Sequence, residues 1–256
     1  MKTAIPLFIG ASVFFSHTSF SQTCEQVLAG TAKDYTAPCI YLGAYAELQN
    51  NYYKQSNSEY FPAITALWRY VYIDGSELGM YFAGDSKDDV YWYSSLHLAY
   101  EEAPYKHLKS EYSDKKLNQD DATMAGFGFA FGSNWGHVVL RSQSDLSDTY
   151  NGHEISLNYR YLWQYKNLQT TPFVGTRYLD NNKAEYLLSH PSLINRDTPK
   201  SGAEFLTGVN FIYNISAHWS LYQLSEYQHL SDDLSQMSLV KSKQAWSALF
   251  GINYLF

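Results

Sequence analysis

The sequence predicts an all-β fold: a closed antiparallel transmembrane β-barrel of about twelve strands, or alternatively about ten. The last eleven residues, WSALFGINYLF, alternate apolar with small or polar residues and close on an aromatic residue. Similar alternation recurs upstream, and 17% of residues are aromatic although the mean hydropathy is only −0.35. Such strands suit a wall with lipid outside, a wet interior and aromatic girdles at both membrane interfaces. The alternative is a secreted all-β protein with Tyr-rich loops.

Residues 1–21 predict a secretory signal peptide. Lys2 is their only charge, 4–15 form a short apolar stretch, and Ser19 and Ser21 are the small residues that precede a cleavage ahead of Gln22. About a dozen apolar residues are too few for a spanning helix, which needs nearer twenty. We therefore expect a signal peptide over 1–21, a periplasmic N-terminal tail over 22–38 and a single barrel domain over 39–256.

The two cysteines, Cys24 and Cys39, both precede or begin the first strand. In an oxidising periplasm they are expected to form a disulfide that ties the tail to the barrel rim. No His or Cys cluster accompanies them, so neither a metal site nor a cofactor is expected.

The predicted strands follow one another from residue 39 to the end of the chain. Each has about 9–14 residues, the length that a tilted strand needs to cross the hydrocarbon. They lie near 39–50, 61–73, 77–85, 89–100, 122–131, 135–143, 152–163, 168–179, 202–214, 218–230 and 243–256. This count is odd, whereas bacterial single-chain barrels have an even number, and we expect the error near 101–121.

The segment GHEISLNYRYLW shows the alternation most clearly. Leu157, the residues two positions before and after it and the residue four positions after it are apolar or aromatic and share one face of the strand, whereas Glu154 and Arg160 share the other face. A charge that faces lipid is costly, so charged faces are predicted to line the interior. The predicted interior charges are Glu47, Arg69, Arg141, Glu154, Arg160, Arg177 and Glu204. They either form a salt-bridged network that plugs the barrel, which we favour, or line a narrow solute channel.

The connections between strands differ in length. Residues 74–76, 132–134 and 214–216 predict tight turns, whereas 101–121, 180–201 and 231–242 are long and polar. Outer-membrane barrels place long loops outside the cell and short turns in the periplasm. The sequence therefore predicts the outer membrane of a Gram-negative cell, in contact with its lipid and lipopolysaccharide.

The C-terminal aromatic residues Tyr254 and Phe256 are expected to form the assembly signal that the barrel-assembly machinery recognises. The formal net charge of −7 argues against a nucleic-acid partner, which would need basic patches.

Catalytic chemistry has weak support in the sequence. His153 adjoins Glu154 near a strand end, and acyl hydrolases use a Ser–His–acid arrangement. No serine stands near a histidine in a diagnostic way, so we expect no catalytic residue and no enzyme. A lipid-acting outer-membrane enzyme is the less favoured alternative.

Three segments carry a family resemblance. They read YFPAITALWRYVYIDGSELGMYF, LQTTPFVGTRYLDNNKAEYLLS and ISAHWSLYQLSEYQHLSDDLSQMSLVKSKQAWSALFGINYLF. In these segments, and in their order, the chain resembles the MipA/OmpV family of outer-membrane proteins over nearly the whole mature length. It departs at 237–240, where the family's proline is missing, and in the charged insert at 101–121.

The resemblance implies a non-catalytic scaffold role at the outer membrane. In that family, the best-known member links a bifunctional murein synthase with a lytic transglycosylase. A small solute channel or a surface adhesin remains the alternative.

Overall fold

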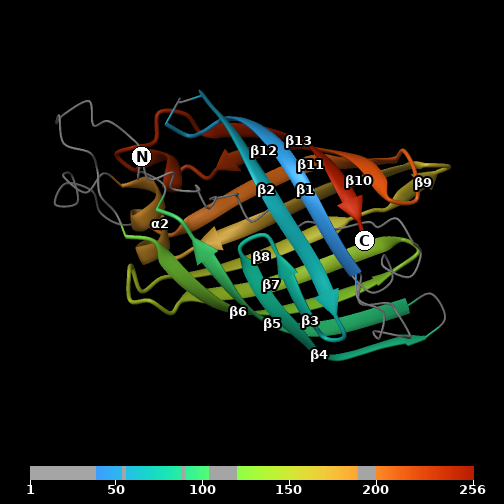
Figure 1. Ribbon diagram of the computed structural model, residues 1–256. Coiled ribbons are helices and arrows are strands. Elements are labelled where there is room, and N and C mark those ends of the chain that lie inside the picture. The colour runs from blue at the N-terminus through green and yellow to red at the C-terminus, as the bar shows by residue number, and fades with distance from the viewer. Residues whose placement is uncertain (1–38, 54–55, 88–89, 104–119, 190–199) are drawn as a thin grey trace, which may run out of the picture.

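The computed structural model describes residues 39–53, 56–87, 90–103, 120–189 and 200–256, and in it the chain forms one antiparallel sheet rolled into a barrel (Figure 1). Strand β1 pairs with β13 from Tyr41 opposite Leu255 to Asn50 opposite Trp246, which closes the ring. The first and last strands of the chain therefore lie side by side.

The elements follow the chain in a simple meander. The strands are β1 (Cys39–Asn50), β2 (Ser56–Trp68), β3 (Val71–Asp74), β4 (Glu77–Lys87), β5 (Val90–Glu101), β6 (Ala122–Ser133), β7 (Gly136–Asp145), β8 (His153–Arg160), β9 (Trp163–Tyr165), β10 (Leu168–Leu179), β11 (Gly202–Asn214), β12 (Trp219–Leu230) and β13 (Gln244–Leu255). The helices are α2 (Asn181–Leu188) and the 3-10 turn η1 (Leu234–Gln236).

The wall has twelve strands. β8 and β9 are successive parts of one wall strand, because both pair with β10 and only Tyr161 and Leu162 separate them. The predicted closed, twelve-stranded antiparallel barrel is thus confirmed.

The missing strand does not lie where the sequence placed it. The segment predicted as one strand over 61–73 is two strands, β2 and β3, joined by a turn at Arg69 and Tyr70. Arg69 has a backbone φ of 55°, in the left-handed region that a tight turn requires. Most of the suspected segment, 104–119, lies outside the described residues.

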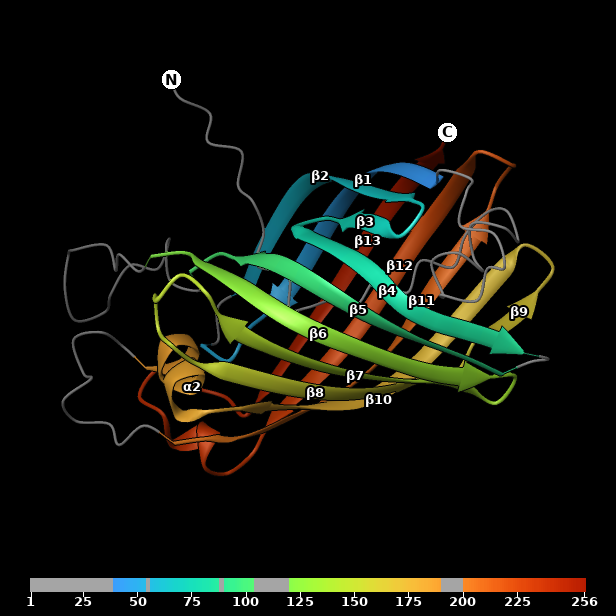
Figure 2. The same cartoon turned by 90° about the horizontal axis from the view of Figure 1, so that it is seen from below.

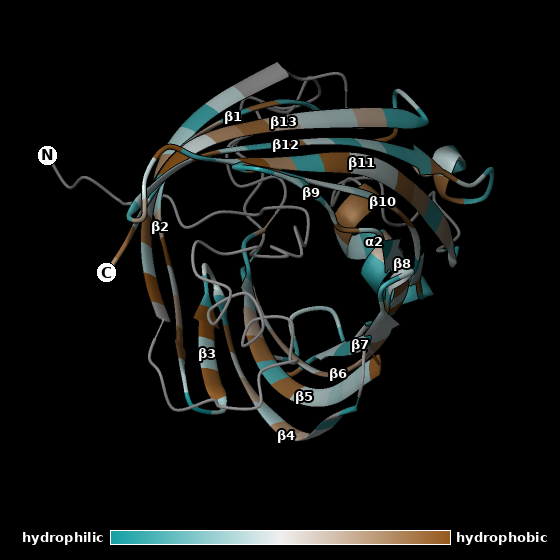
Figure 3. Cartoon of the chain, turned by 90° about the vertical axis from the view of Figure 1, so that its right-hand side faces the viewer, coloured by the Kyte–Doolittle hydropathy of each residue, from teal (hydrophilic) through white to brown (hydrophobic). Residues whose placement is uncertain are grey.

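Alternation along each strand separates the lipid-facing side from the interior. Leu157 on β8 is 47% exposed, whereas its neighbour Asn158 is 2% exposed. Successive side chains of a strand point to opposite faces, so each wall strand presents one apolar and one polar row. Figure 3 looks along the barrel and shows the ring of strands that separates these two environments.

The two rims of the barrel differ. At the short-turn rim, β2–β3, β6–β7 and β9–β10 are each joined by two residues. At the long-loop rim lie α2, which falls within the predicted loop 180–201, and η1; Figure 2 shows α2 at the opposite end from β9. Within the described ranges, no helix has the length and apolar character needed to span a bilayer.

Candidate functional site

Three loops pack together at the long-loop rim into a unit that we call the loop cap. Its core is apolar and buried, and consists of Tyr52, Leu179, Ala184, Leu188, Leu230, Leu234, Met237 and Ala245. Main-chain hydrogen bonds connect the loops: the Leu239 N–H donates to the Leu188 carbonyl at 3.1 Å, and the Lys241 N–H donates to the Tyr52 carbonyl at 2.9 Å. The cap is therefore a packed structure with its own small core.

Beneath the loop cap lies a cluster that we call the charge network. It consists of Glu101, Glu154, Arg177, Lys183 and Glu204, three carboxylates against two cations. Lys183 and Glu204 are each 1% exposed and Glu154 is 5% exposed. Buried charges are tolerated where they pair with one another, and these do.

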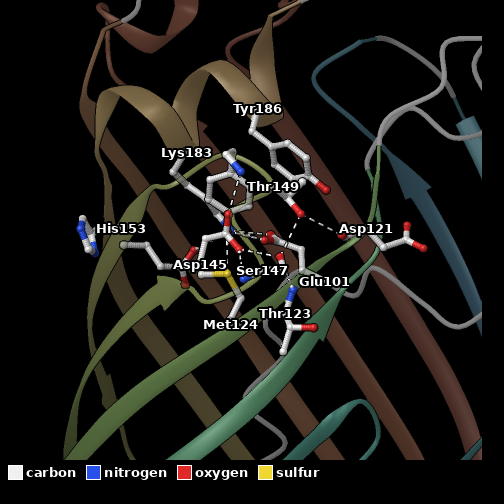
Figure 4. Close-up of polar contacts among 12 residues, drawn as sticks. Glu101, Asp121, Thr123, Met124, Asp145, Ser147, Thr149, His153, Lys183 and Tyr186 are labelled. Atoms are coloured by element: carbon white, nitrogen blue, oxygen red, sulfur yellow. Dashed lines mark hydrogen bonds and ion pairs between the residues drawn. The ribbon is translucent and has the colours of Figure 1, made fainter.

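Helix α2 places Lys183 in the charge network. The Asp180 side chain caps the helix by accepting from the Lys183 main-chain N–H at 2.8 Å. The Lys183 ammonium then reaches Glu101 Oε1 at 2.5 Å, Glu154 Oε2 at 3.5 Å and the Tyr150 hydroxyl at 2.9 Å. Figure 4 shows Lys183 and Glu101 pointing toward one another.

Arg177 joins the second half of the network to the first. Its Nε donates to Glu204 Oε2 at 2.7 Å, and its Nη1 lies 3.9 Å from Glu154 Oε2. Glu204 also accepts from the Tyr52 hydroxyl at 2.5 Å. The network therefore spans β5, β8, β10, β11, α2 and the loop after β1.

Arg141 on β7 extends this set of polar contacts. Its guanidinium pairs with Glu77 at 2.5 Å. Exchanging the amide oxygen and nitrogen of Gln143 satisfies both of its neighbours: in that orientation Gln143 donates to Glu154 Oε1 at 2.8 Å and accepts from Arg141 at 3.2 Å. Polar contacts thus follow the inner wall without a break from β4 to β11.

The other predicted interior charges lie apart from the network. Glu47 on β1 is 8% exposed and stands opposite Glu59 in the β1–β2 register. Arg160 on β8 is 6% exposed, with its guanidinium carbon 5.7 Å from the centre of the Phe173 ring.

The prediction for Arg69 was wrong. This residue is exposed in the β2–β3 turn and does not line the interior. The strand parity that assigned it to the inner face ends at Trp68, because the chain reverses direction there.

The structure places the terminal features only in part. Cys39 is the first residue of β1, whereas Cys24 lies outside the described residues, so the disulfide stays a prediction. Tyr254 lies near the end of β13, and the centroid of its ring is 4.8 Å from the ring centroids of both Trp219 and Phe256. Their role as an assembly signal also stays a prediction.

A serine and a histidine do meet on the outer face of the wall. Ser144 Oγ lies 2.6 Å from His153 Nδ1 across the β7–β8 pair. The carboxylate of Asp180 accepts from the His153 main-chain N–H at 2.8 Å and not from the imidazole. In the described part of the chain, no carboxylate contacts the imidazole, so the acid member of a triad is not in place.

Sequence reasoning missed Lys183, Tyr150 and Glu101. All three lie outside the predicted strands, in connections where period-two alternation gives no information about the direction of a side chain; the structure places Lys183 on α2, Tyr150 between β7 and β8, and Glu101 at the end of β5. Asp180 three residues before Lys183 is a recognisable N-cap signal that could have placed the helix.

Burial raises the pKa of the Tyr150 phenol well above its usual value, and the nearby Glu101 carboxylate raises it further. Tyr150 therefore remains a neutral hydrogen-bond donor.

Across the described residues, no group of three or more His, Cys, Asp or Glu side chains could hold a metal ion.

A family model described as MltA-interacting protein MipA matches residues 42–256, which is nearly the whole barrel. The chain belongs to the MipA family. Among relatives, the MltA-interacting protein of Escherichia coli K12 is 26% identical over 198 residues, 70% of this chain and 73% of that protein. YiaT of Escherichia coli O157:H7, named as a candidate outer membrane protein, is 22% identical over 234 residues, 86% of this chain and 92% of that one.

Solved outer-membrane barrels are similar in a general way to this member of the MipA family. OmpT of Vibrio cholerae is 7% identical, with a TM-score of 0.44, over 88% of this chain and 99% of that structure. Family membership and the closed twelve-stranded ring together make the chain an outer-membrane β-barrel protein.

Proposed function

We propose that this MipA-family barrel is a non-catalytic docking protein that links a murein synthase to a lytic transglycosylase at the outer membrane. The observation that carries the proposal is the family match, together with a relative whose name is MltA-interacting protein. Processing after Ser21 and a periplasmic tail over 22–38 belong to the same proposal.

The state of the interior supports a docking role over transport. The charges of the network bind one another beneath the loop cap, and their side chains are largely withdrawn from solvent. Salt-bridged side chains that fill a mid-sized barrel leave little room for a permanent aqueous channel.

The docking surface would lie at the short-turn rim, which faces the periplasm in outer-membrane barrels. Trp163 and Tyr165 of β9 are exposed there, at 51% and 58%. Tyr and Trp are favoured at protein interfaces as well as at membrane interfaces, since each joins a large apolar area to a polar tip.

Affinity capture tests the proposal. The detergent-solubilised full-length protein should retain an MltA-type lytic transglycosylase and the bifunctional penicillin-binding protein of the same bacterium. Deletion of 22–38 in a barrel that still folds separates a role of the tail from one of the rim. Failure of the full-length protein to bind either enzyme would contradict the docking role.

Passage of small solutes is a second candidate, favoured by the distribution of charge. Glu47 on β1 and Glu59 on β2 lie six strands around the twelve-strand ring from Arg141 on β7 and Arg160 on β8. Figure 3 shows these strand pairs on opposite sides of the barrel. Opposite charges on facing walls create a transverse field that orients dipolar solutes. Steady single-channel steps in planar bilayers would favour this role over docking alone.

A further inference from the structure

Helix α2 presents two chemically different faces to its surroundings. Ala184 and Leu188, four residues apart, pack into the apolar core of the loop cap. Lys183 and Tyr186, three residues apart, belong to the other face, and the Tyr186 ring stacks on Tyr150 with centroids 4.3 Å apart. The helix is therefore held by apolar contacts on one side and by polar contacts on the other.

The polar side holds the Lys183 ammonium in a cage. Glu101 and Glu154 supply two carboxylates, and the Tyr150 hydroxyl lies 2.9 Å from the ammonium. The centre of the Tyr150 ring is 5.0 Å from the same nitrogen, within the range of a cation–π contact. Carboxylates, a hydroxyl and an aromatic face are the groups that recognise a primary ammonium. They come from β5, β8 and the loop after β7, and not from α2 itself.

A fixed plug would not need this arrangement. Apolar side chains of similar volume usually hold buried elements at least as well as an ion pair, because a buried ion pair must offset its own desolvation. The cap core next to Lys183 is built in that apolar way. A buried ion pair is better suited to a contact that can exchange, since a competing cation can replace one partner.

We propose that α2 is a displaceable lid at the long-loop rim and that its latch is a primary-ammonium site. A soluble primary amine binds Glu101, Glu154 and Tyr150 in place of Lys183, and α2 then leaves the inner wall. The lid does not depend on the docking role, and it would hold for a channel or a docking protein alike.

Cysteine accessibility measures the position of α2. Ala184 is 0% exposed, so a cysteine there reacts with a maleimide only when the helix is displaced. The Ala184→Cys substitution is made in full-length protein that carries Cys24→Ser and Cys39→Ser. We expect Lys183→Gln to raise the labelling rate by about tenfold or more. The matched control is Lys200→Gln, a half-exposed lysine that binds Gln236, and it should leave the rate unchanged.

The ligand site is tested in the protein that retains Lys183, so that a variant that fails to fold cannot decide the outcome. Butane-1,4-diamine should accelerate labelling in a saturable way, whereas tetramethylammonium at equal ionic strength should not, because it has no N–H to donate. The diamine should have no effect once Lys183 is glutamine. Equal labelling rates for folded Lys183→Gln and the parent would overturn the latch. A diamine no more effective than tetramethylammonium would overturn the ammonium site.

Discussion

Among the residues that the structure describes, Glu204 is the carboxylate with the smallest exposed fraction. It is 1% exposed, and it accepts from the Tyr52 hydroxyl and from two nitrogens of Arg177. A buried carboxylate that accepts several hydrogen bonds contributes to stability mainly through its partners. If the carboxylate is removed, its donors stay buried without an acceptor or an opposite charge, which is costly.

Replacing Glu204 with Gln should destabilise the barrel severely. The variant keeps the volume of the side chain but removes its negative charge, so that Glu154, 3.9 Å away, is the remaining ion-pair partner of Arg177 among the described residues. Removal of one partner from a buried ion pair costs about 3–5 kcal/mol. Denaturant titration in lipid vesicles measures the loss. Asp232→Asn is the control, because its pair with Lys243 is exposed and should contribute no measurable stability. Similar unfolding of both variants would contradict the role of Glu204.

The two tyrosines near Lys183, Tyr150 and Tyr186, are expected to make the stability of the protein depend on pH in the alkaline range. Burial raises the pKa of Tyr150 and of Tyr186 well above the usual value. Above about pH 10 the unfolded chain releases these protons while the folded chain keeps them, so stability falls as the pH rises. The denaturation midpoint should therefore be lower at pH 11 than at pH 8. In Tyr150→Phe this decline should be smaller, and an equal decline would exclude Tyr150 as a contributor.

At the scale of elements, the β2–β3 hairpin shows where an alternating sequence stops being informative. Trp68 pairs with Val71 across the turn, so the outward-facing residues change from even to odd numbers. Two-residue hairpins are usually recognised by Asn-Gly or Asp-Gly. Arg69 and Tyr70 carry neither signal, and the apolar letters continue on both sides. Because the sequence-based prediction missed this turn, it also missed the twelfth strand and the exposure of Arg69.

Arg69→Asn should stabilise the protein slightly. A left-handed backbone conformation costs an ordinary L-residue about 1–2 kcal/mol, and asparagine adopts it more readily. We expect the free energy of unfolding to rise by up to about 1 kcal/mol, measured by denaturant titration. A substantial loss of stability would instead indicate that the Arg69 side chain makes a contact inside the barrel.

Helix α2 was predicted only as part of a polar loop. Its first positions, Asn181 and Asn182, are weak helix formers, and eight residues are too few for an isolated helix to be stable in water. The helix forms because Asp180 caps it and because the loop cap buries one face. The cap residue was readable from the sequence, whereas the burial depends on loops more than forty residues away.

Asp180→Ala should loosen α2. The substitution removes the acceptor for the main-chain N–H groups of Lys183 and His153, and loss of an N-cap costs about 1–2 kcal/mol. Hydrogen exchange of the α2 amides should accelerate. Asp233→Ala is the matched control, because Asp233 precedes η1 without a side-chain capping bond. Equal acceleration in both variants would show that the Asp180 cap is not what holds the helix.

At the scale of the whole molecule, alternation along the strands was enough to predict the barrel, and the lengths of the connections were enough to predict its two unlike rims. It could not predict which charges pair. Lys183 and Glu101 are 82 residues apart in sequence, and they meet only because a loop helix folds back onto the inner wall. Pairing of this kind depends on loop conformation and on the reach of long side chains, neither of which a period of two contains.

If the apolar rows of the strands face lipid, the loss of stability caused by a new charge on the outer face should depend on its height along the barrel. Leu157 on β8 is 47% exposed on the outer face, and an arginine there should cost about 2–4 kcal/mol in a bilayer. Ile215, 53% exposed in the turn between β11 and β12, lies at the rim, where an arginine should cost about 0–1 kcal/mol. Reversible unfolding in phosphatidylcholine vesicles measures both variants. If Leu157→Arg cost no more than Ile215→Arg, the apolar rows of this barrel would not face acyl chains.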